Sequence, residues 1–131
     1  MIVVDTHVIA YLYLPGEFTG AAERLFDRNP EWAAPILWRS ELRSILAGYV
    51  RRRMITLAQA RDLQSEAESL LEGNEYEVES GRVFDLVQES GCPACDCEFV
   101  ALAAQLRTKL VTMDKQLLKA FPTLTLALST A

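Results

Sequence analysis

Apolar and polar positions alternate in short blocks along the chain, and these blocks predict its strands and helices. Continuous apolar runs, typical of strands buried on both faces of a parallel sheet, cover residues 2–4, 32–34 and 110–112. Two further short strands are predicted over residues 76–78 and 124–126. Helical periodicity predicts helices over residues 7–14, 20–28, 35–53, 57–71, 80–90, 94–108 and 114–119. Strands that alternate with helices predict an α/β fold, in which three layers (α/β/α) enclose a short, mostly parallel sheet.

Turn and cap residues set the expected ends of these helices. Pro15-Gly16 stops the first helix, and Thr19 is a candidate cap for the second. Pro35 suits the first turn of the long third helix. Thr56, followed three residues later by a glutamine, is a capping signature for the fourth helix. Gly91 closes the helix over residues 80–90.

The overall composition is that of an ordinary globular chain. The length of 131 residues favours one domain, residues 1–131, with 50% hydrophobic and 24% charged residues. The net charge is −5 and the isoelectric point is near 4.9, so general coating of nucleic acid is not expected. A local basic patch or a bound metal ion could still supply positive charge for a nucleic-acid enzyme. The chain start lacks a signal-peptide pattern and no apolar run matches a membrane span, so we expect a cytoplasmic protein.

Two carboxylates stand where the pattern places strand ends. Asp5 ends the run 2–4, and Asp114 follows the run 110–112. Open parallel sheets bind ligands beyond the carboxyl ends of their strands, so both side chains are candidates for one site. Each also has a simpler interpretation as the N-cap of the helix that follows.

Two more carboxylates lie on helix faces that are otherwise apolar. Glu41 lies three residues after Trp38 and four before Ile45, on the apolar stripe of its helix. Asp96 shares a face with Phe99 in a first helical turn, where the helix dipole favours an anion. The alternatives are an ion pair of Glu41 with a buried arginine, and simple first-turn placement of Asp96. Because lone buried carboxylates are costly and Mg²⁺ takes oxygen ligands, the four acids together predict a divalent-metal site.

Other charged residues receive plainer interpretations. Glu98 is expected to point away from the apolar face into solvent. Arg39 and Arg43 flank Glu41 and are candidates for contact with a polyanion or for pairs with acidic surface groups. The run Arg51–Arg53 is interpreted as solvated cations that favour the C-terminal end of a helix.

The three cysteines cluster in one short segment. Cys92 and Cys95 have the spacing of a redox pair at a helix start. A zinc site is less favoured, because there is no second cysteine pair and His7 is the only histidine. We interpret Cys92, Cys95 and Cys97 as small, reduced, partly buried residues.

Four segments of the chain resemble the PIN-domain nucleases, and among them the VapC-type toxins of prokaryotic toxin–antitoxin pairs. The segment Ile2–Thr6 contains the first acid and Trp38–Leu42 contains the glutamate. The segment Asp96–Ala103 contains the third acid and Leu110–Lys115 contains the fourth. Each motif is short, and the joint order and spacing carry the resemblance across nearly the whole chain. It implies a PIN-like fold and a metal-dependent endoribonuclease that hydrolyses RNA phosphodiester bonds, as the toxin of a type II toxin–antitoxin pair.

The resemblance also implies a site, a cofactor and partners. The residues that would hold Mg²⁺ or Mn²⁺ and carry the reaction are Asp5, Glu41, Asp96 and Asp114. Thr6 and Thr112 are expected to hydrogen-bond these carboxylates. The implied partners are an RNA substrate, a small antitoxin protein and a second copy of the chain. Two positions depart from the family pattern: Cys95 replaces a usual tyrosine, and Gln116 replaces an acid that bears on a second metal site.

Two other classes of function remain open from the sequence. One is a PIN-like module that binds RNA without cutting it. The other is a receiver-like signalling domain, which shares the length, the α/β sheet and an acidic pocket. The receiver pattern fits less well, because a mid-chain strand that ends in an aspartate is missing, as is a lysine at the end of the late strand.

Overall fold

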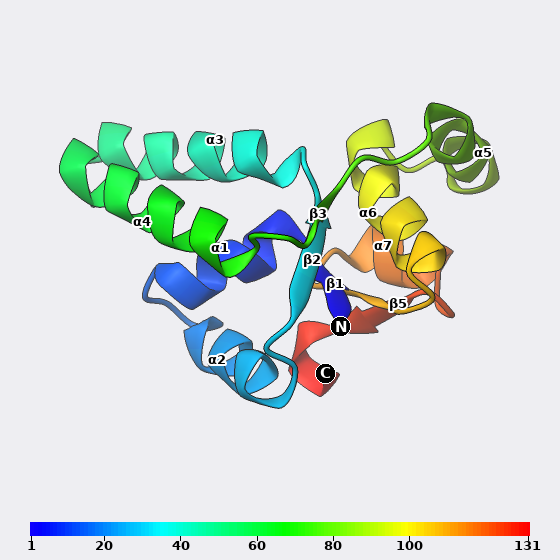
Figure 1. The fold of residues 1–131 in the computed structure, drawn as a ribbon, viewed down its shortest axis with the longest axis horizontal. Helices are drawn as coiled ribbons and strands as arrows, with labels where there is room; N and C mark the ends of the chain where they lie inside the picture. The colour runs from blue at the N-terminus through cyan, green and yellow to red at the C-terminus, as the bar shows by residue number, and fades with distance from the viewer.

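The computed structural model describes residues 1–131, and its strands form one five-stranded sheet (Figure 1). The strands are β1 (Ile2–Val4), β2 (Trp32–Pro35), β3 (Glu75–Tyr76), β4 (Leu110–Thr112) and β5 (Thr125–Ala127). Their order is β3-β2-β1-β4-β5, and every neighbouring pair is parallel. The predicted α/β fold is confirmed, and the sheet is parallel throughout.

The strand order separates this fold from the receiver-like alternative. Flavodoxin-like signalling domains have the order 2-1-3-4-5, with the third strand beside the first. Here the third strand lies at an edge, and β1 pairs with β2 on one side and β4 on the other. The receiver-like interpretation is therefore wrong.

Seven helices cover the sheet. They are α1 (Thr6–Tyr13), α2 (Thr19–Arg28), α3 (Trp38–Arg51), α4 (Leu57–Leu70), α5 (Ser80–Ser90), α6 (Ala94–Gln105) and α7 (Lys115–Ala120). A 3₁₀ turn over Leu128–Thr130 ends the chain. Figure 1 shows α1, α2 and α4 on one side of the sheet and α5 and α6 on the other. No helix combines the length and the apolar character that crossing a bilayer would require.

Local chemistry explains two helix ends that the sequence predicts well. The Thr56 hydroxyl accepts from the Gln59 amide at 3.1 Å, while the Gln59 side chain accepts from the Thr56 amide at 2.8 Å. This reciprocal pair is a capping box and satisfies two amides at the start of α4. Gly91 ends α5 at φ +72°, a left-handed conformation that glycine adopts without steric cost.

Two predicted helix starts are wrong. Thr19 does not cap α2, since Phe18 holds that position and the Thr19 hydroxyl bonds the Leu14 carbonyl and the Gly16 amide instead. Pro35 does not open α3, because it continues β2 and pairs with Tyr76 of β3. A proline is tolerated there because β3 is only two residues long and the next amide, of Ile36, donates to Tyr76.

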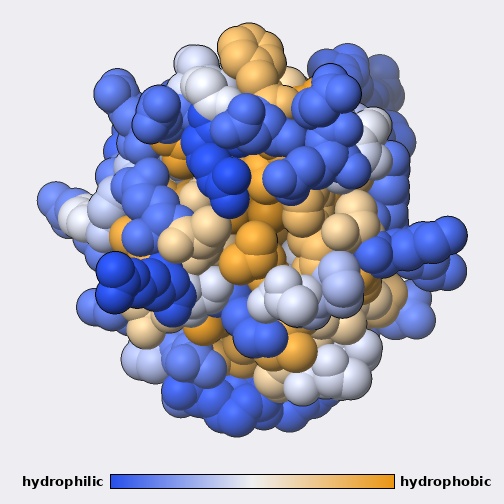
Figure 2. Space-filling model, turned by 90° about the vertical axis from the view of Figure 1, so that its right-hand side faces the viewer, coloured by the Kyte–Doolittle hydropathy of each residue, from blue (hydrophilic) through white to orange (hydrophobic).

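Thirty buried residues form one hydrophobic core that spans both faces of the sheet. The largest fully buried side chains include Trp32 of β2 and Trp38 of α3. Figure 2 shows the face that carries α5, α6 and α7, where apolar side chains gather at the centre and polar side chains surround them. On α5, Phe84 remains 67% exposed.

Candidate active site

The fold brings the four acids from distant parts of the chain to one edge of the sheet. Asp5 directly follows β1, and Asp114 follows the neighbouring parallel strand β4. Glu41 lies in the first turn of α3, and Asp96 lies in the first turn of α6. All four line a single cavity of about 610 Å³. This is the position beyond the carboxyl ends of the strands where parallel sheets bind ligands.

Two threonines hold two of the carboxylates in place. The buried Thr6 hydroxyl donates to Glu41 Oε1 at 2.7 Å and ties α1 to α3. The buried Thr112 hydroxyl donates to Asp5 Oδ2 and accepts from the Asp114 amide, the latter at 3.0 Å. Both threonines therefore hydrogen-bond carboxylates, as the sequence predicts. That either threonine contributes to a reaction stays a prediction.

Asp5 and Asp114 also cap helices, so the simpler interpretation and the site interpretation apply together. Asp5 Oδ1 accepts from the Val8 amide at 3.0 Å at the start of α1. Asp114 Oδ1 accepts from the Gln116 and Leu117 amides at 2.9 and 3.1 Å. The caps use one oxygen of each carboxylate and fix its orientation. Asp114 Oδ2 takes no hydrogen bond from the protein and remains available to a ligand.

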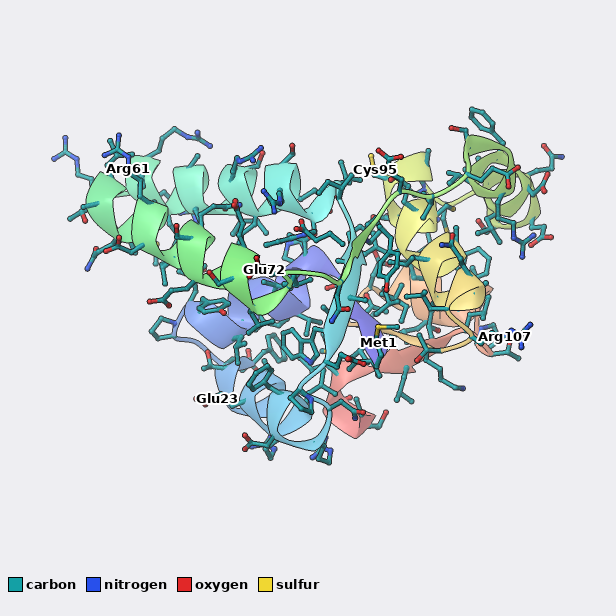
Figure 3. The ribbon with its side chains drawn as sticks, in the orientation of Figure 1. Met1, Glu23, Arg61, Glu72, Cys95 and Arg107 are labelled. Carbon is teal, nitrogen blue, oxygen red and sulfur yellow. The ribbon has the colours of Figure 1, made fainter.

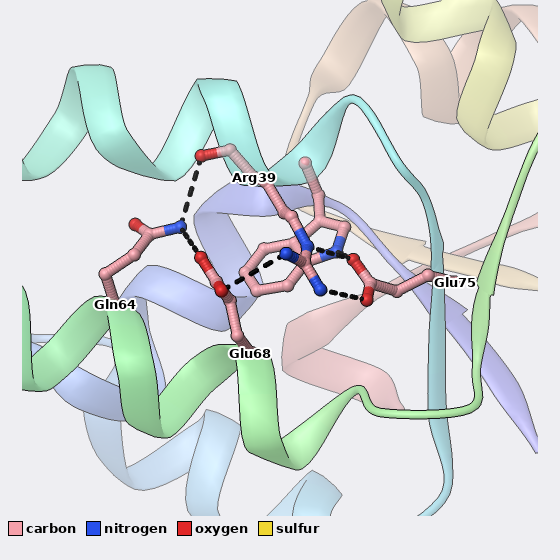
Figure 4. Close-up of polar contacts among 5 residues, drawn as sticks. Arg39, Gln64, Glu68 and Glu75 are labelled. Carbon is pink, nitrogen blue, oxygen red and sulfur yellow. Dashed lines mark hydrogen bonds and ion pairs between the residues drawn. The ribbon is translucent and has the colours of Figure 1, made fainter.

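Glu41 is not paired with a buried arginine. Its hydrogen-bond partner is the Thr6 hydroxyl, and no cation lies within salt-bridge distance of it. Arg39, two residues earlier, turns away and binds Glu75 and Glu68 (Figure 4). A carboxylate on the packed side of α3 therefore has its charge uncompensated by the protein.

Electrostatics couple the acids to one another. Burial is the main cause that raises the pKa of Asp5, with a further rise from the charge of Asp114, against lowering by hydrogen bonds and by His7. Burial also raises the pKa of Asp96, and the charges of Asp114 and Glu41 raise it further. Like charges within range of each other disfavour ionisation, so a nearby cation would favour the fully ionised set.

The donor set fits a hard divalent cation. Four carboxylates supply only oxygen ligands, which Mg²⁺ prefers, and no thiol or second histidine enters the cavity. No three of these side chains already converge closely enough to hold one ion together. The carboxylates are thus gathered around a common cavity without yet meeting at one point.

The sequence interpretation missed two residues at this place. Glu98 is half-buried rather than solvated, and burial together with the charge of Glu41 raises its pKa. His7 lines the cavity beside the acids, and its charge lowers the pKa of Asp5 and of Asp96. His7 directly follows Asp5 and Thr6 at the start of α1, so its position in the sequence was the available signal.

The cysteines lie beside the site without forming part of the cavity wall. Cys92 and Cys97 are buried free thiols, and burial raises the pKa of Cys97. The Cys97 thiol lies 3.7 Å from the Cys92 carbonyl and near the Ser90 hydroxyl, so it packs as a small core residue. Cys95 is exposed at the start of α6 (Figure 3).

Comparisons with known proteins agree with this geometry. A model of the PIN domain matches residues 2–121. Ribonuclease VapC3 of Pyrobaculum aerophilum is 31% identical over 126 residues, which cover 94% of this chain and 96% of that protein.

Solved structures share the fold at lower identity. A toxin–antitoxin complex from Klebsiella pneumoniae matches with a TM-score of 0.71 and 17% identity over 100% of both chains. FitAB bound to an IR36 DNA fragment matches with a TM-score of 0.77 and 16% identity, over 100% of this chain and 97% of that one. With a family model that covers most of its length, and with the same fold in these structures, the chain belongs to the PIN-domain family.

Proposed function

We propose that this protein is a metal-dependent endoribonuclease that hydrolyses RNA phosphodiester bonds, and that residues 1–131 act as one nuclease domain. The observation that carries the proposal is the gathering of four carboxylates around one cavity at the ends of β1 and β4. Its relative in Pyrobaculum aerophilum is named a ribonuclease, which supports the same class of reaction here.

The residues of the site have separate tasks in this proposal. Asp5, Asp96 and Asp114 would hold Mg²⁺ or Mn²⁺ through their carboxylate oxygens. The bound ion supplies activation of water and neutralisation of charge at the phosphate. Glu41 has one oxygen held by Thr6 and a second oxygen that takes no protein hydrogen bond, so it can orient the attacking water or join the ligands.

The threonines act through the carboxylates. Thr112 bridges Asp5 and the Asp114 backbone, and Thr6 fixes the rotamer of Glu41. Hydrogen bonds from the outer shell of a metal site orient its ligands and contribute to affinity. Both hydroxyls are buried, so this orientation is protected from solvent.

We further propose that the protein is the toxin of a type II toxin–antitoxin pair, located in the cytoplasm and active as a homodimer. Its structural neighbours include a toxin–antitoxin complex, which supports a small antitoxin as partner. Exposed apolar residues, Phe84 on α5 and Met54 and Leu57 where α3 meets α4, offer surface to partners. The mass in solution, and co-purification with the product of the neighbouring reading frame, test the two partner proposals.

Cleavage of RNA by purified protein tests the catalytic proposal and separates it from RNA binding without catalysis. We expect cleavage in Mg²⁺ or Mn²⁺ and none in EDTA. Asp96→Asn, which keeps the shape and removes a ligand charge, should lose most of the cleavage. Asp62→Asn changes an exposed carboxylate of α4 by the same chemistry and should cleave normally. Equal cleavage in EDTA, or a fully active Asp96→Asn protein, would overturn the proposal.

A further inference from the structure

A second cavity continues directly from the acidic one. It has a volume of about 490 Å³ and lies between α1, the turn that follows it and the C-terminal half of α3. The two cavities share four lining residues, His7, Tyr11, Ser44 and Ile45, so they form one continuous groove. We call the added part the α1–α3 groove. Its volume lies in the range of clefts that take a small ligand, such as one or a few linked nucleotides.

Two arginine side chains converge over the floor of the α1–α3 groove. Gly48 of α3 lines the groove, and a guanidinium nitrogen of Arg52 lies 3.2 Å from where a Cβ on Gly48 would stand. A guanidinium nitrogen of Arg51 lies 3.8 Å from the same point. Because Gly48 has no side chain, both guanidinium groups can lie close to the backbone of α3 at this residue.

These two cations have no acidic partner. Neither Arg51 nor Arg52 makes a salt bridge or a side-chain hydrogen bond, whereas Arg39 at the other end of α3 binds Glu68 and Glu75. Two guanidinium groups held close together repel each other unless an anion lies between them. Guanidinium forks match the geometry of phosphate oxygens, and paired arginines are a common phosphate site.

The side chain of Arg52 is also held in position by a contact within the protein. The guanidinium carbon of Arg52 lies 4.9 Å from the centre of the Tyr49 ring, within the range of a cation–π contact. This contact restricts a long side chain that would otherwise move freely at an exposed helix end. Tyr11 packs on Phe18 at 5.0 Å along the opposite wall of the groove, so the wall between the acids and the arginines is aromatic.

We propose that the α1–α3 groove binds the single-stranded RNA that flanks the cleaved bond, with a backbone phosphate between Arg51 and Arg52. This inference rests on the proposed ribonuclease function. The scissile phosphate lies at the four acids, and the strand continues past Tyr11 and Ile45 to the arginine pair. On a chain of net charge −5, this pair supplies a local positive field that the acidic site lacks.

Binding of a short fluorescent single-stranded RNA, measured by anisotropy in EDTA, tests the inference without cleavage. The double variant Arg51→Gln/Arg52→Gln should bind about 10- to 100-fold more weakly, as expected for loss of charge-assisted hydrogen bonds. The slope of log affinity against log salt should fall by about 0.7, the value for one phosphate contact on a single strand. Arg51→Lys/Arg52→Lys keeps the charges without the forks and should restore part of the affinity.

A matched control removes two other unpaired arginines. Arg24→Gln/Arg82→Gln makes the same change of charge on α2 and α5, where both side chains are exposed and line neither the acidic cavity nor the α1–α3 groove, and should bind RNA as the wild type does. Equal loss in both double variants, or no loss in Arg51→Gln/Arg52→Gln, would overturn the inference. Melting curves of each variant establish that the fold is intact.

Steady-state cleavage in Mg²⁺ separates this inference from the proposed function. The groove variant should raise KM while leaving kcat within about twofold, because the arginines bind the flank and do not touch the reacting atoms. A wild-type protein that cuts no RNA would refute the ribonuclease proposal, and the anisotropy comparison would still decide the groove. Normal KM in the groove variant of an active enzyme would refute the groove alone.

Discussion

Glu41 is the carboxylate whose position is hardest to explain without a ligand. It neither caps a helix nor pairs with an arginine, and its charge raises the pKa of both Asp96 and Glu98. Thr6 supplies its hydrogen bond from α1. A glutamine at this position could still accept that bond while removing the repulsive charge.

We therefore predict that Glu41→Gln leaves the metal-free protein as stable as the wild type or more so. Metal binding should weaken and RNA cleavage should fall by at least about 100-fold, more than the usual cost of losing an outer-shell partner. Melting curves in EDTA and cleavage rates in Mg²⁺ measure the two effects. Glu23→Gln, an exposed change on α2, serves as the control. A marked drop in the EDTA melting temperature with normal cleavage would contradict the assignment.

The start of α3 depends on a contact with a strand far away in sequence. Glu75 of β3 accepts two hydrogen bonds from Arg39, each at 2.6 Å, and one from the Trp38 indole at 2.8 Å (Figure 4). Leu37, at the N-cap position, makes no side-chain cap bond, so Glu75 is what fixes the first turn. Glu68 and Gln64 extend the same network to α4. The first turn also carries Glu41, so the network holds the backbone from which that carboxylate projects.

We predict that Glu75→Gln lowers the melting temperature at neutral pH by roughly a few degrees. Arg39 holds the pKa of Glu75 below its ordinary value of 4.5, so the stabilisation is present above that pH and is lost as the pH falls through the folded-state value. The difference between variant and wild type should therefore shrink in acid. Thermal melts at several pH values measure this, with exposed Glu72→Gln as the control. A difference that stays constant down to strongly acidic pH would exclude the charged contact as its cause.

Local pattern explains why most elements could be predicted from the sequence. Apolar runs located β1, β2 and β4 to within one residue, and the Thr56 signature located α4, because those features depend only on neighbours in the chain. Local pattern places Pro35 in a helix, because it does not reveal the pairing of Pro35 with Tyr76 in a two-residue strand far along the chain. This error occurs because a distant segment decides the local conformation, whereas the Thr19 prediction is wrong because its hydroxyl bonds two residues of the preceding turn, Leu14 and Gly16.

At the site too, sequence pattern identifies candidate residues but not the contacts that their side chains make with distant segments. The four acids could be selected from strand ends and helix faces, and the structure places them around one cavity. The sequence interpretation left Arg39 a choice between a polyanion and acidic groups, and contact with Glu75 decided it. Convergence of Arg51 and Arg52 over Gly48 depends on side-chain direction at a helix end, which periodicity does not specify.

The proposed metal site joins segments from both ends and the middle of the chain. Asp5 and Asp114 lie on adjacent strands, Glu41 lies on α3, and Asp96 lies on α6. An ion that binds these four carboxylates only in the folded state stabilises the entire fold by mass action. It also offsets the mutual repulsion of the acids, which the charge of His7 offsets only in part.

We predict that Mg²⁺ raises the melting temperature in a concentration-dependent way. A hundredfold excess over the dissociation constant contributes about 2.7 kcal/mol to the free energy of unfolding, which corresponds to a shift of roughly several degrees. In Asp96→Asn the shift should shrink strongly, whereas in exposed Asp62→Asn it should match the wild type. Scanning calorimetry over a Mg²⁺ series, at constant ionic strength to remove general screening, measures the shift. Equal shifts in all three proteins would mean that Mg²⁺ acts on surface charge in general, and that the four carboxylates do not share an ion.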